Sequence, residues 1–395
     1  MKIGIIGGGP AGMFAALEAS KRFSDVTIFD NNGFLGRKLA ATGAGRCNLT
    51  NINVTPNSYR SYEKFEFGNI VQNFDYFFFQ KYLEELGLFT YHTDDGWVYP
   101  LSNSASNVAA FLEEILIKHD VLINKNIEVI DILHDDNLFN LVLSSGERLR
   151  FDRIILATGG KAYPQLNASD KILNSLIHFG HKLLPAFPAL APILTSKDET
   201  KMVNGVRCDA AIRILDHNEL VGTVIGNIIF TDWGINGPGV MNLSHLYHKR
   251  KGNLRIEIDF IPVMPKNFLE NSIKNEQKFL KLETPFLPLM NKKIIYQLAN
   301  NCDLNPQKPY ISSDFKKMMS KLYFTENVLG TRDFQFSQIS TGAIKSLHIN
   351  SETLESTIQP GLYFAGELLD VFGPCGGYNL HWAFISGIVA GRSIK

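Results

Sequence analysis

The first thirty residues constrain the fold of this chain more than any other segment. A short apolar run at residues 2–6 is followed directly by GGGPAG at residues 7–12. Residues 13–22 have a helix-forming composition, and a second apolar run, residues 26–29, ends at Asp30. A strand, a glycine turn, a helix and a second strand in this order predict the first βαβ unit of a Rossmann-type α/β domain.

Each glycine of the pattern has its own task in holding a dinucleotide. Gly7 allows the tight turn, Gly9 lets a pyrophosphate approach the backbone, and Gly12 lets the helix pack close to the strand. The start of the helix faces the phosphates. Asp30 follows Gly12 by eighteen residues and can accept hydrogen bonds from ribose hydroxyls. Because this acid disfavours a 2′-phosphate, the pattern predicts FAD or NAD rather than NADP.

Two later segments favour FAD over NAD. In FDRIILATGG, residues 151–160, an apolar run ends in small residues that let the chain pass close to a ligand. In residues 360–394 a short strand leads to Gly366 and Glu367, then to a glycine loop and a helix that starts near Asn379. The carboxylate can bind a ribityl hydroxyl, and the helix N-terminus can stabilise negative charge on the N1/C2=O edge of a reduced flavin. An NAD-binding domain does not need a C-terminal segment that returns to the cofactor. The sequence therefore predicts an FAD site built from both chain ends.

The segment TGAGRCNLTN, residues 42–51, adds to this site. Backbone amides of residues 43–48 can line a phosphate or a flavin edge, and Arg46 and Lys38 can offset the pyrophosphate charge. No strand leads into this segment, so it is not a second Rossmann fingerprint, and the chain contains no other complete one. A tightly held NAD(P)H domain is therefore not expected, and NAD(P)H is expected at most as a transient electron donor.

Several motifs together carry a family resemblance. They are GGGPAGMFAA (7–16), GRKLAATGAGRCNLTN (36–51), LATGGKAYPQL (156–166), FTDWGINGPGV (230–240) and GLYFAGELLDVFGPCGGYNLHWAFISG (361–387). In this order they span nearly the whole chain, which resembles the YhiN-type bacterial flavoproteins. That family is described as aminoacetone oxidase family FAD-binding enzymes, NAD(P)/FAD-dependent oxidoreductases or 3-dehydro-bile-acid reductases. The segments GRCNLTN and GPCGGYNL are its most specific signatures here.

The resemblance implies a glutathione-reductase-like FAD-binding domain that is discontinuous in sequence, with residues 1–190 and 335–395. Between these halves it implies an inserted β-barrel-like domain, residues 191–261. A small helical domain with a return strand follows at residues 262–334. The inserted segments are expected to pack on the FAD domain, because no low-complexity linker separates them.

The residues agree with this division. Short β-like runs occur in the first inserted segment, among them residues 220–224 and 228–231. The second inserted segment is Lys-rich, with helical patches at residues 268–282 and 314–322 between prolines.

The expected cofactor contacts lie in the glycine turn, at the strand ends and in the two family-specific loops. They are Gly7, Gly9, Pro10, Ala11, Gly12, Asp30, Asn31, Lys38, Leu39, Thr42, Gly43, Gly45, Arg46, Cys47, Asn48, Val129, Ala157, Thr158, Gly159, Gly366, Glu367, Gly376, Gly377, Tyr378 and Asn379.

The chain departs from the family pattern in two places. Where the family has a glycine-rich GSTGDG-like run after its Tyr-Pro pair, residues 167–172 read NASDKI. Where the family commonly has GRVFP, residues 96–100 read GWVYP. These positions are expected at or near the substrate side, so the resemblance implies the cofactor but no particular substrate.

Four residues are candidates for chemistry. Tyr378 and His381 flank the start of the last helix, where either could donate a proton near the flavin or simply pack. Asp232 and Trp233 lie in a glycine loop after an apolar strand, where they could line a substrate pocket or form an ordinary turn. The sequence leaves both alternatives open.

Two further pairs of residues invite a chemical interpretation. Cys47 and Cys375 lie in the family-specific loops, but they share no CxxC context, so we expect small packed residues rather than redox partners. His245 and His248 are spaced like a metal pair, but no third ligand is evident, so no metal site is expected.

Composition narrows the remaining function classes. With 45% hydrophobic and 20% charged residues, the chain has the profile of a soluble globular protein. Lys+Arg and Asp+Glu both number 39, and a general polyanion binder usually carries a basic excess, so nucleic acid is an unexpected partner. No apolar run approaches the ~20 residues of a membrane span. Four scattered cysteines, and a first strand that begins at Lys2 without room for a signal peptide, predict a cytoplasmic protein.

The sequence thus predicts an FAD-dependent oxidoreductase that passes hydride between a small, partly apolar substrate and flavin N5. One alternative is an FAD-containing protein that modifies or binds RNA. Another is a redox-sensing flavoprotein without small-molecule turnover. The oligomeric state stays open.

Overall fold

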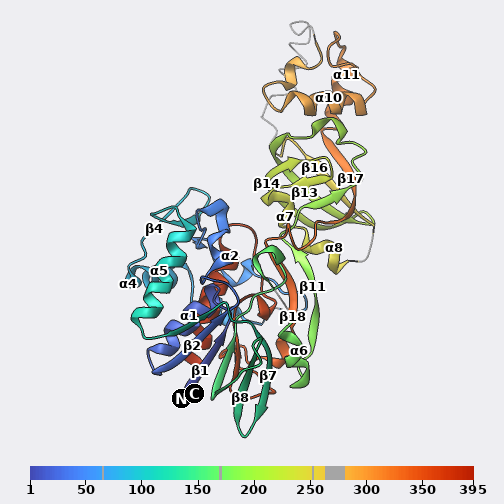
Figure 1. Ribbon diagram of the computed structural model, residues 1–395. Helices are drawn as coiled ribbons and strands as arrows, with labels where there is room; N and C mark the ends of the chain where they lie inside the picture. The colour runs from blue at the N-terminus through green and yellow to red at the C-terminus, as the bar shows by residue number, and fades with distance from the viewer. Residues whose placement is uncertain (65, 169–170, 251–252, 263–280) are drawn as a thin grey trace. The chain divides into compact units, whose positions relative to one another are not determined.

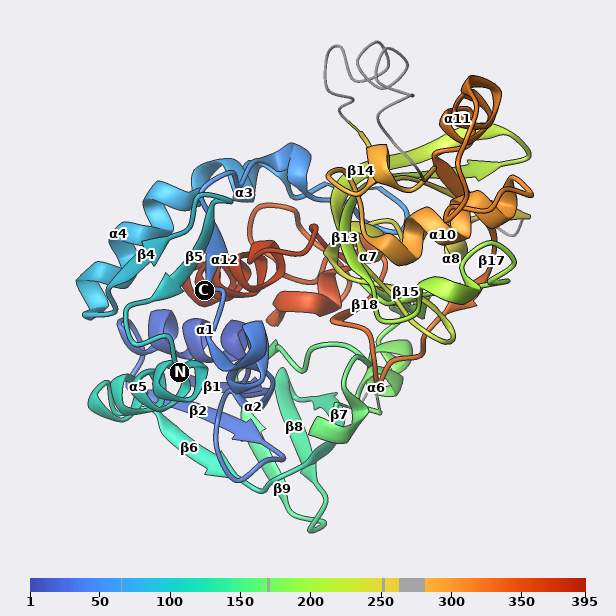
Figure 2. The ribbon, with the colours of Figure 1, turned by 90° about the horizontal axis from the view of Figure 1, so that it is seen from above.

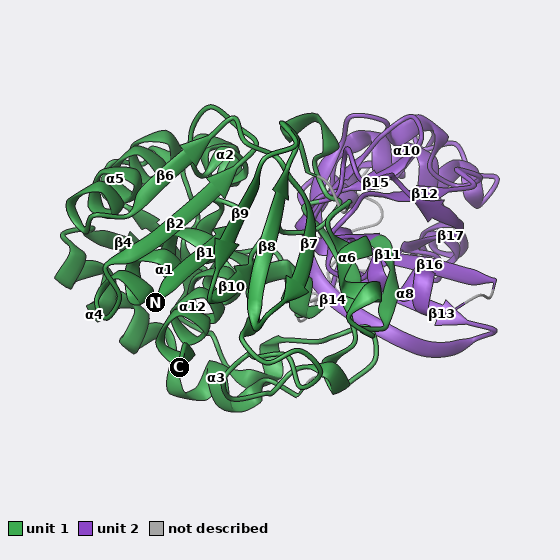
Figure 3. Ribbon diagram, turned by 60° about the horizontal axis from the view of Figure 1, so that its bottom comes forward, with its two compact units in different colours: residues 1–187, 338–395 green, residues 188–337 purple. Residues whose placement is uncertain are grey.

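The computed structural model describes most of the chain, namely residues 1–64, 66–168, 171–250, 253–262 and 281–395. The chain forms two compact units (Figure 3), unit 1 with residues 1–187 and 338–395 and unit 2 with residues 188–337. The polypeptide therefore leaves unit 1 once and returns to it once. The sequence places these crossings near residues 190 and 335, and its division into three domains stays a prediction.

Unit 1 is built on a five-stranded parallel sheet in the order β19-β10-β1-β2-β6. Its central strands read as continuous apolar runs because both faces of a parallel sheet are covered. The carboxyl ends of parallel strands share one edge, so the loops that follow β1, β10 and β19 meet there. The strands are β1 Lys2–Ile6, β2 Asp25–Asp30, β6 Leu122–Lys125, β10 Arg153–Leu156 and β19 Leu362–Phe364.

Two helices from opposite ends of the sequence lie side by side in unit 1 (Figure 2). They are α1, Pro10–Ser20, and α12, Tyr378–Ser393. Gly387 allows their close approach, because a Cβ added there would lie 2.2 Å from the Ala11 carbonyl oxygen. The first and last segments of the chain therefore share one helix pair.

A buried carboxylate joins the far ends of the same two helices. Glu18 of α1, which is 4% exposed, accepts a hydrogen bond from Arg392 Nε of α12 at 2.5 Å and from the Tyr82 hydroxyl at 2.5 Å. Lys21 also pairs with it. The charge-assisted bonds from Arg392 and Lys21 keep the pKa of Glu18 below its usual value although its burial opposes this.

Further elements complete unit 1 (Figure 1). A three-stranded antiparallel meander, β7-β8-β9, packs against β1 and β10, and a small sheet in the order β3-β5-β4 carries the GWVYP segment. Strands β11 and β18 pair with each other at the two crossings. The bounds are α2 Arg37–Ala40, β3 Thr50–Asn51, α3 Gly68–Asn73, α4 Tyr76–Leu86, β4 Thr90–His92, β5 Trp97–Pro100, α5 Ala105–Lys118, β7 Val129–Asp135, β8 Leu138–Leu143, β9 Arg148–Phe151, α6 Leu173–His178, β11 Leu183–Ala189 and β18 Ile339–Ile344.

Unit 2 contains a closed six-stranded barrel in the order β12-β15-β14-β13-β16-β17. Alternate side chains of its strands, such as Ile212, Ile214, Ile256 and Ile258, are fully buried and form a core separate from that of unit 1. The bounds are β12 Ile193–Thr195, β13 Arg207–Asp216, β14 Glu219–Phe230, β15 Gly234–Asn236, α7 Pro238–Met241, α8 His245–Lys249, β16 Leu254–Asp259 and β17 Tyr323–Thr331.

Strand β14 corrects one sequence expectation. Residues 220–224 and 228–231 are predicted as separate runs, but the structure has one strand that pairs with β13 along its length. Its glycines make room for neighbours rather than ending the strand. A Cβ at Gly222 would lie 2.6 Å from Leu246, and one at Gly226 would lie 3.0 Å from Gly239.

The segment between β16 and β17 carries two described helices, α10 Lys292–Asn301 and α11 Ser312–Met319. The helical patch predicted at 314–322 corresponds to α11, which ends earlier because β17 begins at Tyr323. The patch predicted at 268–282 lies, except for its last two residues, outside the described residues.

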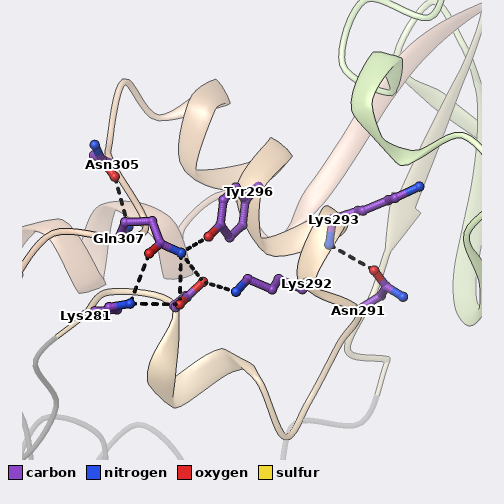
Figure 4. Close-up of polar contacts among 8 residues, drawn as sticks. Lys281, Asn291, Lys292, Lys293, Tyr296, Asn305 and Gln307 are labelled. Atoms are coloured by element: carbon purple, nitrogen blue, oxygen red, sulfur yellow. Dashed lines mark hydrogen bonds and ion pairs between the residues drawn. The ribbon is translucent and has the colours of Figure 1, made fainter.

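A buried carboxylate organises this helical segment (Figure 4). Glu283 is 4% exposed, and both of its oxygens accept hydrogen bonds from Gln307 Nε2 at 3.1 Å. Lys292 and Lys281 lie 3.4 Å and 4.0 Å from its oxygens, and Gln307 also reaches the Tyr296 hydroxyl. One carboxylate therefore ties the turn before α10 to the loop that follows it.

Candidate cofactor site

The glycine turn after β1 has the shape that the sequence predicts. Gly7 has φ +105°, and a Cβ at Gly12 would lie 1.8 Å from the Gly7 carbonyl oxygen, so neither position accepts a side chain. On the Cβ side of Gly9 there is open space to at least 4 Å. Pro10 and Ala11 open α1, whose N-terminus carries no side-chain cap. Bare amides beside open space suit a pyrophosphate.

Asp30 lies at the end of β2 beside this turn. Its Oδ2 accepts the Gly8 N–H at 2.7 Å, and its Oδ1 accepts both the backbone N–H and the side-chain Nδ2 of Asn32 at 2.8 Å. A carboxylate has about four acceptor positions, so Oδ2 keeps one for a ribose hydroxyl. The acid is thus fixed at the place where the fingerprint requires it.

The end of β10 contributes a second open edge. The space beside Gly159, which has φ +73°, is open to 4 Å. The Oγ1 of Thr158 is buried and has no hydrogen-bond partner among the described residues. Ala157 packs under the turn, since its carbonyl would meet a Cβ at Gly7. A buried hydroxyl without a partner beside open backbone fits a ligand that supplies the missing bond.

Glu367, after β19, joins three segments at the same sheet edge. Its Oε1 accepts the backbone N–H of Ser340 at 2.6 Å and the Ser340 hydroxyl at 2.8 Å. Its Oε2 forms an ion pair with Lys38 Nζ at 3.0 Å. Gly366 is held by the Ser386 hydroxyl of α12 at 2.9 Å. Glu367, predicted to bind a ribityl hydroxyl, and Lys38, the predicted cation, therefore lie together. Ser340 of β18 joins them, and the sequence analysis did not predict this serine.

The two family-specific loops, one from each end of the chain, contact each other. With its amide oriented by its neighbours, Asn48 donates to the Thr50 carbonyl and accepts the Gly377 N–H at 3.2 Å. Asn51 donates to the Gly376 carbonyl at 3.0 Å. Gly377 comes so close to β3 that a Cβ there would lie 2.3 Å from the Thr50 oxygen. These contacts set the start of α12 against the loop that contains Gly43 and Gly45.

Arg46 lies on the small aromatic sheet. Its guanidinium stacks 4.1 Å from the Tyr99 ring centroid, and its Nη2 donates to the Tyr91 hydroxyl at 3.0 Å. Its Nε contacts Asn103 Oδ1 at 3.3 Å, and the Tyr91 hydroxyl donates to the same oxygen at 2.6 Å. Neither tyrosine was singled out by the sequence, where only the altered GWVYP motif pointed to this strand.

The thiols of both family-specific loops are protonated groups. Burial raises the pKa of Cys47 to about 12 and that of Cys375 to about 12. The four cysteines, all within the described residues, form no disulfide there. A nucleophilic or redox-active cysteine instead needs a lowered thiol pKa.

The remaining residues predicted to contact the cofactor differ from one another in burial and in their hydrogen-bond partners. Leu39 is fully buried and its carbonyl accepts the Thr42 hydroxyl, so both shape the loop after α2. Asn31 is half-buried and donates to the Asn167 carbonyl. Val129 is buried at the start of β7. Asn379 caps its own loop through the Gly373 backbone.

The candidate catalytic residues differ in what they can offer. His381 is fully buried, its Nδ1 lies 2.8 Å from the Thr50 hydroxyl and its Nε2 lies 2.9 Å from the Phe74 carbonyl. Burial lowers its pKa to about 4, and both ring nitrogens are engaged. Tyr378 is the first residue of α12 and half-buried.

Asp232 and Trp233 belong to unit 2. Asp232 is exposed, while Trp233 lies 4.8 Å from the guanidinium of Arg332, which also stacks 3.6 Å from the Phe336 ring. Within the described residues, no three His, Cys, Asp or Glu side chains gather as a metal site needs. No helix in that part of the chain has the length and apolar content of a membrane span.

Comparisons with known proteins agree with this architecture. The family described as "HI0933-like protein Rossmann domain" matches residues 1–393. A 3-dehydro-bile acid delta(4,6)-reductase from Clostridium scindens is 31% identical over 408 residues, which cover 99% of this chain and 98% of the relative. Ribosomal RNA dihydrouridine synthases from Haemophilus influenzae and Escherichia coli are 28% and 27% identical over 99% and 97% of this chain, and over 98% and 95% of their own lengths.

A solved structure has a similar fold. The 3-ketosteroid delta1-dehydrogenase from Sterolibacterium denitrificans, in complex with 1,4-androstadiene-3,17-dione, superposes with a TM-score of 0.50. The alignment covers 99% of this chain and 98% of that one, at 10% identity. At this identity the likeness concerns the fold alone.

Proposed function

This chain belongs to the HI0933-like Rossmann family and is an FAD-dependent oxidoreductase, and from that premise we propose that it reduces a C=C bond conjugated with a carbonyl group. The substrate is a small, partly apolar molecule. When bound, reduced FAD would supply the hydride from its N5 position, and NAD(P)H would be the transient donor that reduces the flavin. The double bond gains this hydride and one proton, and the cofactor loses two electrons.

One observation carries the proposal: relatives with unrelated substrates are named for the same kind of reaction. A delta(4,6)-reductase of a 3-dehydro bile acid reduces carbon–carbon double bonds in a molecule with a ring ketone. A dihydrouridine synthase adds hydrogen to the double bond of a uracil ring, which is conjugated with a carbonyl. The shared element is the conjugated C=C, so it is the part of the substrate that we carry over to this chain.

The cofactor site supports this chemistry through its charges. In the proposed site Lys38 and the bare N-terminus of α1 would offset the pyrophosphate charge, and Glu367 and the Thr158 hydroxyl would bind the sugar and ribityl hydroxyls. The N-terminus of α12 favours a reduced, negatively charged ring. The raised pKa values of the Cys47 and Cys375 thiols argue against thiol chemistry in this reaction, while the alternative of a redox-sensing flavoprotein without small-molecule turnover is addressed by the turnover test below.

The first test is the identity of the cofactor and its turnover. The purified protein is expected to be yellow and to release FAD rather than FMN on denaturation. Anaerobic reduction by NADH or NADPH, followed by addition of 2-cyclohexen-1-one, is expected to reoxidise the flavin and yield cyclohexanone. Release of FMN, or reoxidation by oxygen alone and by no conjugated acceptor, would contradict the proposal.

A specific surface favours RNA as a second candidate substrate. The whole chain has no net charge, but described residues 281–322 contain seven lysines, no arginine and three acidic residues. All seven lysines are exposed, whereas Glu283 is buried within its own lysine pairs. A local basic surface can contact phosphates even when the net charge is zero. The lysines are Lys281, Lys292, Lys293, Lys308, Lys316, Lys317 and Lys321.

Salt-dependent RNA binding tests this second candidate. If the lysines contact phosphates, affinity for ribosomal RNA fragments falls steeply between 50 mM and 200 mM salt. Lys316→Gln with Lys317→Gln reduces the slope of this salt dependence by about two, whereas the matched pair Lys64→Gln with Lys81→Gln in unit 1 leaves it unchanged. RNA affinity that is weak at low salt and insensitive to the α11 pair would leave the small molecule as the substrate.

A further inference from the structure

Arg46 is held in one orientation by three neighbours. The flat face of its guanidinium stacks on Tyr99, 4.1 Å from the ring centroid. Its Nη2 donates a hydrogen bond to the Tyr91 hydroxyl, and its Nε donates one to Asn103 Oδ1. Nη1 has no hydrogen-bond partner among the described residues, and the side chain is exposed. A stacked guanidinium with one open N–H edge is prepared for an oxygen ligand, because little rotational freedom remains to be lost.

The small sheet relates Arg46 to the start of α12. Trp97 and Tyr99 are two residues apart in β5, so their side chains share one face, and Tyr91 lies directly opposite Tyr99 in β4. Trp97 on this face touches the glycine loop, since a Cβ at Gly376 would lie 2.9 Å from its Nε1. Arg46 is therefore a neighbour of the loop that precedes α12.

The neighbours of Arg46 differ from those of the glycine turn that suits the pyrophosphate. The turn at Gly7–Gly12 lies before α1, and Lys38 is the cation that pairs with Glu367 at the sheet edge. The loop before α12 is instead the part of the site expected at the flavin ring. With the flavin ring at that loop, Arg46 would lie near the reacting end, where the carbonyl of a substrate would also lie.

We propose that Arg46 binds the carbonyl oxygen of the substrate, and that Tyr91, Tyr99 and Asn103 are its positioning residues. This inference rests on the proposed function. When hydride adds to the β carbon, the π electrons move to the carbonyl oxygen, and the Arg46 N–H edge stabilises the charge that develops there. A proton from solvent then adds at the α carbon, which completes the reduced bond. The role differs from the sequence expectation, in which Arg46 holds the cofactor.

A phenolate probe tests this role without turnover. The oxygen of 4-chlorophenolate carries the kind of charge that develops on the carbonyl oxygen, and its binding to oxidised holoenzyme is followed by absorbance. Arg46→Met is expected to weaken phenolate binding by about tenfold to hundredfold, which is the range for losing a charge-assisted hydrogen bond. Arg46→Lys keeps the charge and is expected to recover part of the affinity.

A second variant isolates the positioning residues. Tyr91→Phe removes only the hydroxyl that holds Nη2, and is expected to weaken phenolate binding by about threefold to tenfold and to raise the apparent pKa of the bound phenol. His92→Ala is the matched control, because His92 is exposed on the opposite face of β4 and its one hydrogen bond among the described residues is with the neighbouring Thr93 carbonyl. The FAD dissociation constant is expected to change less than about threefold in all four variants.

Two results would overturn the inference. One is a loss of FAD affinity of about tenfold or more in Arg46→Met, which would make Arg46 a cofactor ligand. The other is phenolate affinity within about threefold of wild type in both Arg46→Met and Tyr91→Phe. If the phenolate results hold but neither 2-cyclohexen-1-one nor uridine reoxidises the reduced wild-type enzyme, the proposed reaction fails while the oxyanion site stands.

Discussion

Cys47 is a buried thiol in a loop with unusual backbone geometry. It has φ +66°, a left-handed backbone conformation that residues other than glycine and asparagine rarely adopt. With a pKa raised to about 12, almost none of it is thiolate at neutral pH. A cysteine selected for redox exchange needs the opposite environment. Its small volume and its proximity to Thr42 explain its position without chemistry.

We therefore expect Cys47→Ser to keep FAD and to be reduced at nearly the wild-type rate. The serine hydroxyl can take over the contact with Thr42, so loop geometry is retained. Flavin absorbance and anaerobic stopped-flow reduction measure both properties. A variant that binds FAD fully yet fails to turn over, or a thiolate-to-flavin charge-transfer band in the wild type, would make the thiol a participant.

His181 gives unit 1 a defined response to acid. It is 3% exposed, its Nε2 lies 3.0 Å from the Ser356 hydroxyl, and His348 lies beside it with 5.6 Å between ring centroids. Burial lowers its pKa to about 4. The unfolded chain takes up this proton near pH 6.5, but the folded chain does so only near pH 4. Stability is therefore full above about pH 6.5 and is lost as the pH falls toward 4.

His181→Gln is expected to flatten this pH dependence, since glutamine does not titrate. The wild type should lose roughly 3 kcal/mol of unfolding free energy more than the variant between pH 7 and pH 4. Urea denaturation at several pH values measures the difference. Parallel curves for the two proteins would show that another group causes the acid response, with the buried His381 as the next candidate.

At the scale of elements, the pairing of α1 with α12 decides where the cofactor site is built. Gly387 lets the α12 backbone contact Ala11, the second residue of α1. The contacts of Gly387 with Ala11 and of Gly391 with Ala15 show that the two helices run in the same direction, so their packing fixes the spacing between their two positive ends. The sequence predicts each helix from its own composition, but no local pattern predicts that they touch.

Gly387→Ala is expected to destabilise unit 1 by about 1–3 kcal/mol, because a Cβ 2.2 Å from a backbone oxygen forces the helices apart. FAD affinity is expected to fall as well, since the α1 N-terminus moves with Ala11. Thermal unfolding and FAD titration measure the two effects. Ser393→Ala, at the half-buried end of α12, is the control and is expected to change neither. Unchanged affinity with lowered stability would mean that helix spacing does not set the cofactor site.

At the scale of the molecule, the two units have separate hydrophobic cores. The large core cluster of unit 1 contains residues from both of its chain segments and none from 188–337. The barrel of unit 2 buries its own alternating side chains around Phe230 and Phe324. Two cores in one chain can unfold separately. The predicted cofactor contacts all lie in unit 1.

We therefore expect FAD to stabilise one of two unfolding transitions. At a free concentration 100 times its dissociation constant, a ligand adds about 2.7 kcal/mol to the unit that binds it. Calorimetry of the intact protein with and without FAD should show one transition that moves and one that stays. Limited proteolysis should identify the moving unit as residues 1–187 with 338–395. Equal movement of both transitions would mean that the units unfold together.

The sequence by itself determined the Rossmann fold and the cofactor class. The tasks of Gly7, Gly12 and Asp30 are local, because each follows from backbone geometry within one βαβ unit, and the structure places them accordingly. Cys47 is fully buried, which agrees with a packed residue, while the absence of a redox role stays a prediction.

Only the tertiary structure decided which distant residues meet. Ser340 meets Glu367, and Tyr91 and Asn103 meet Arg46, because the folded chain packs strands and loops together across sequence separations of about 27 to 57 residues. Side chains at such separations carry no periodic signal, because their proximity depends on the sheet register and on glycines such as Gly376 that let loops approach closely. For the same reason the sequence identifies Arg46 as a cation but does not predict its neighbours, which are the aromatic residues of the small sheet.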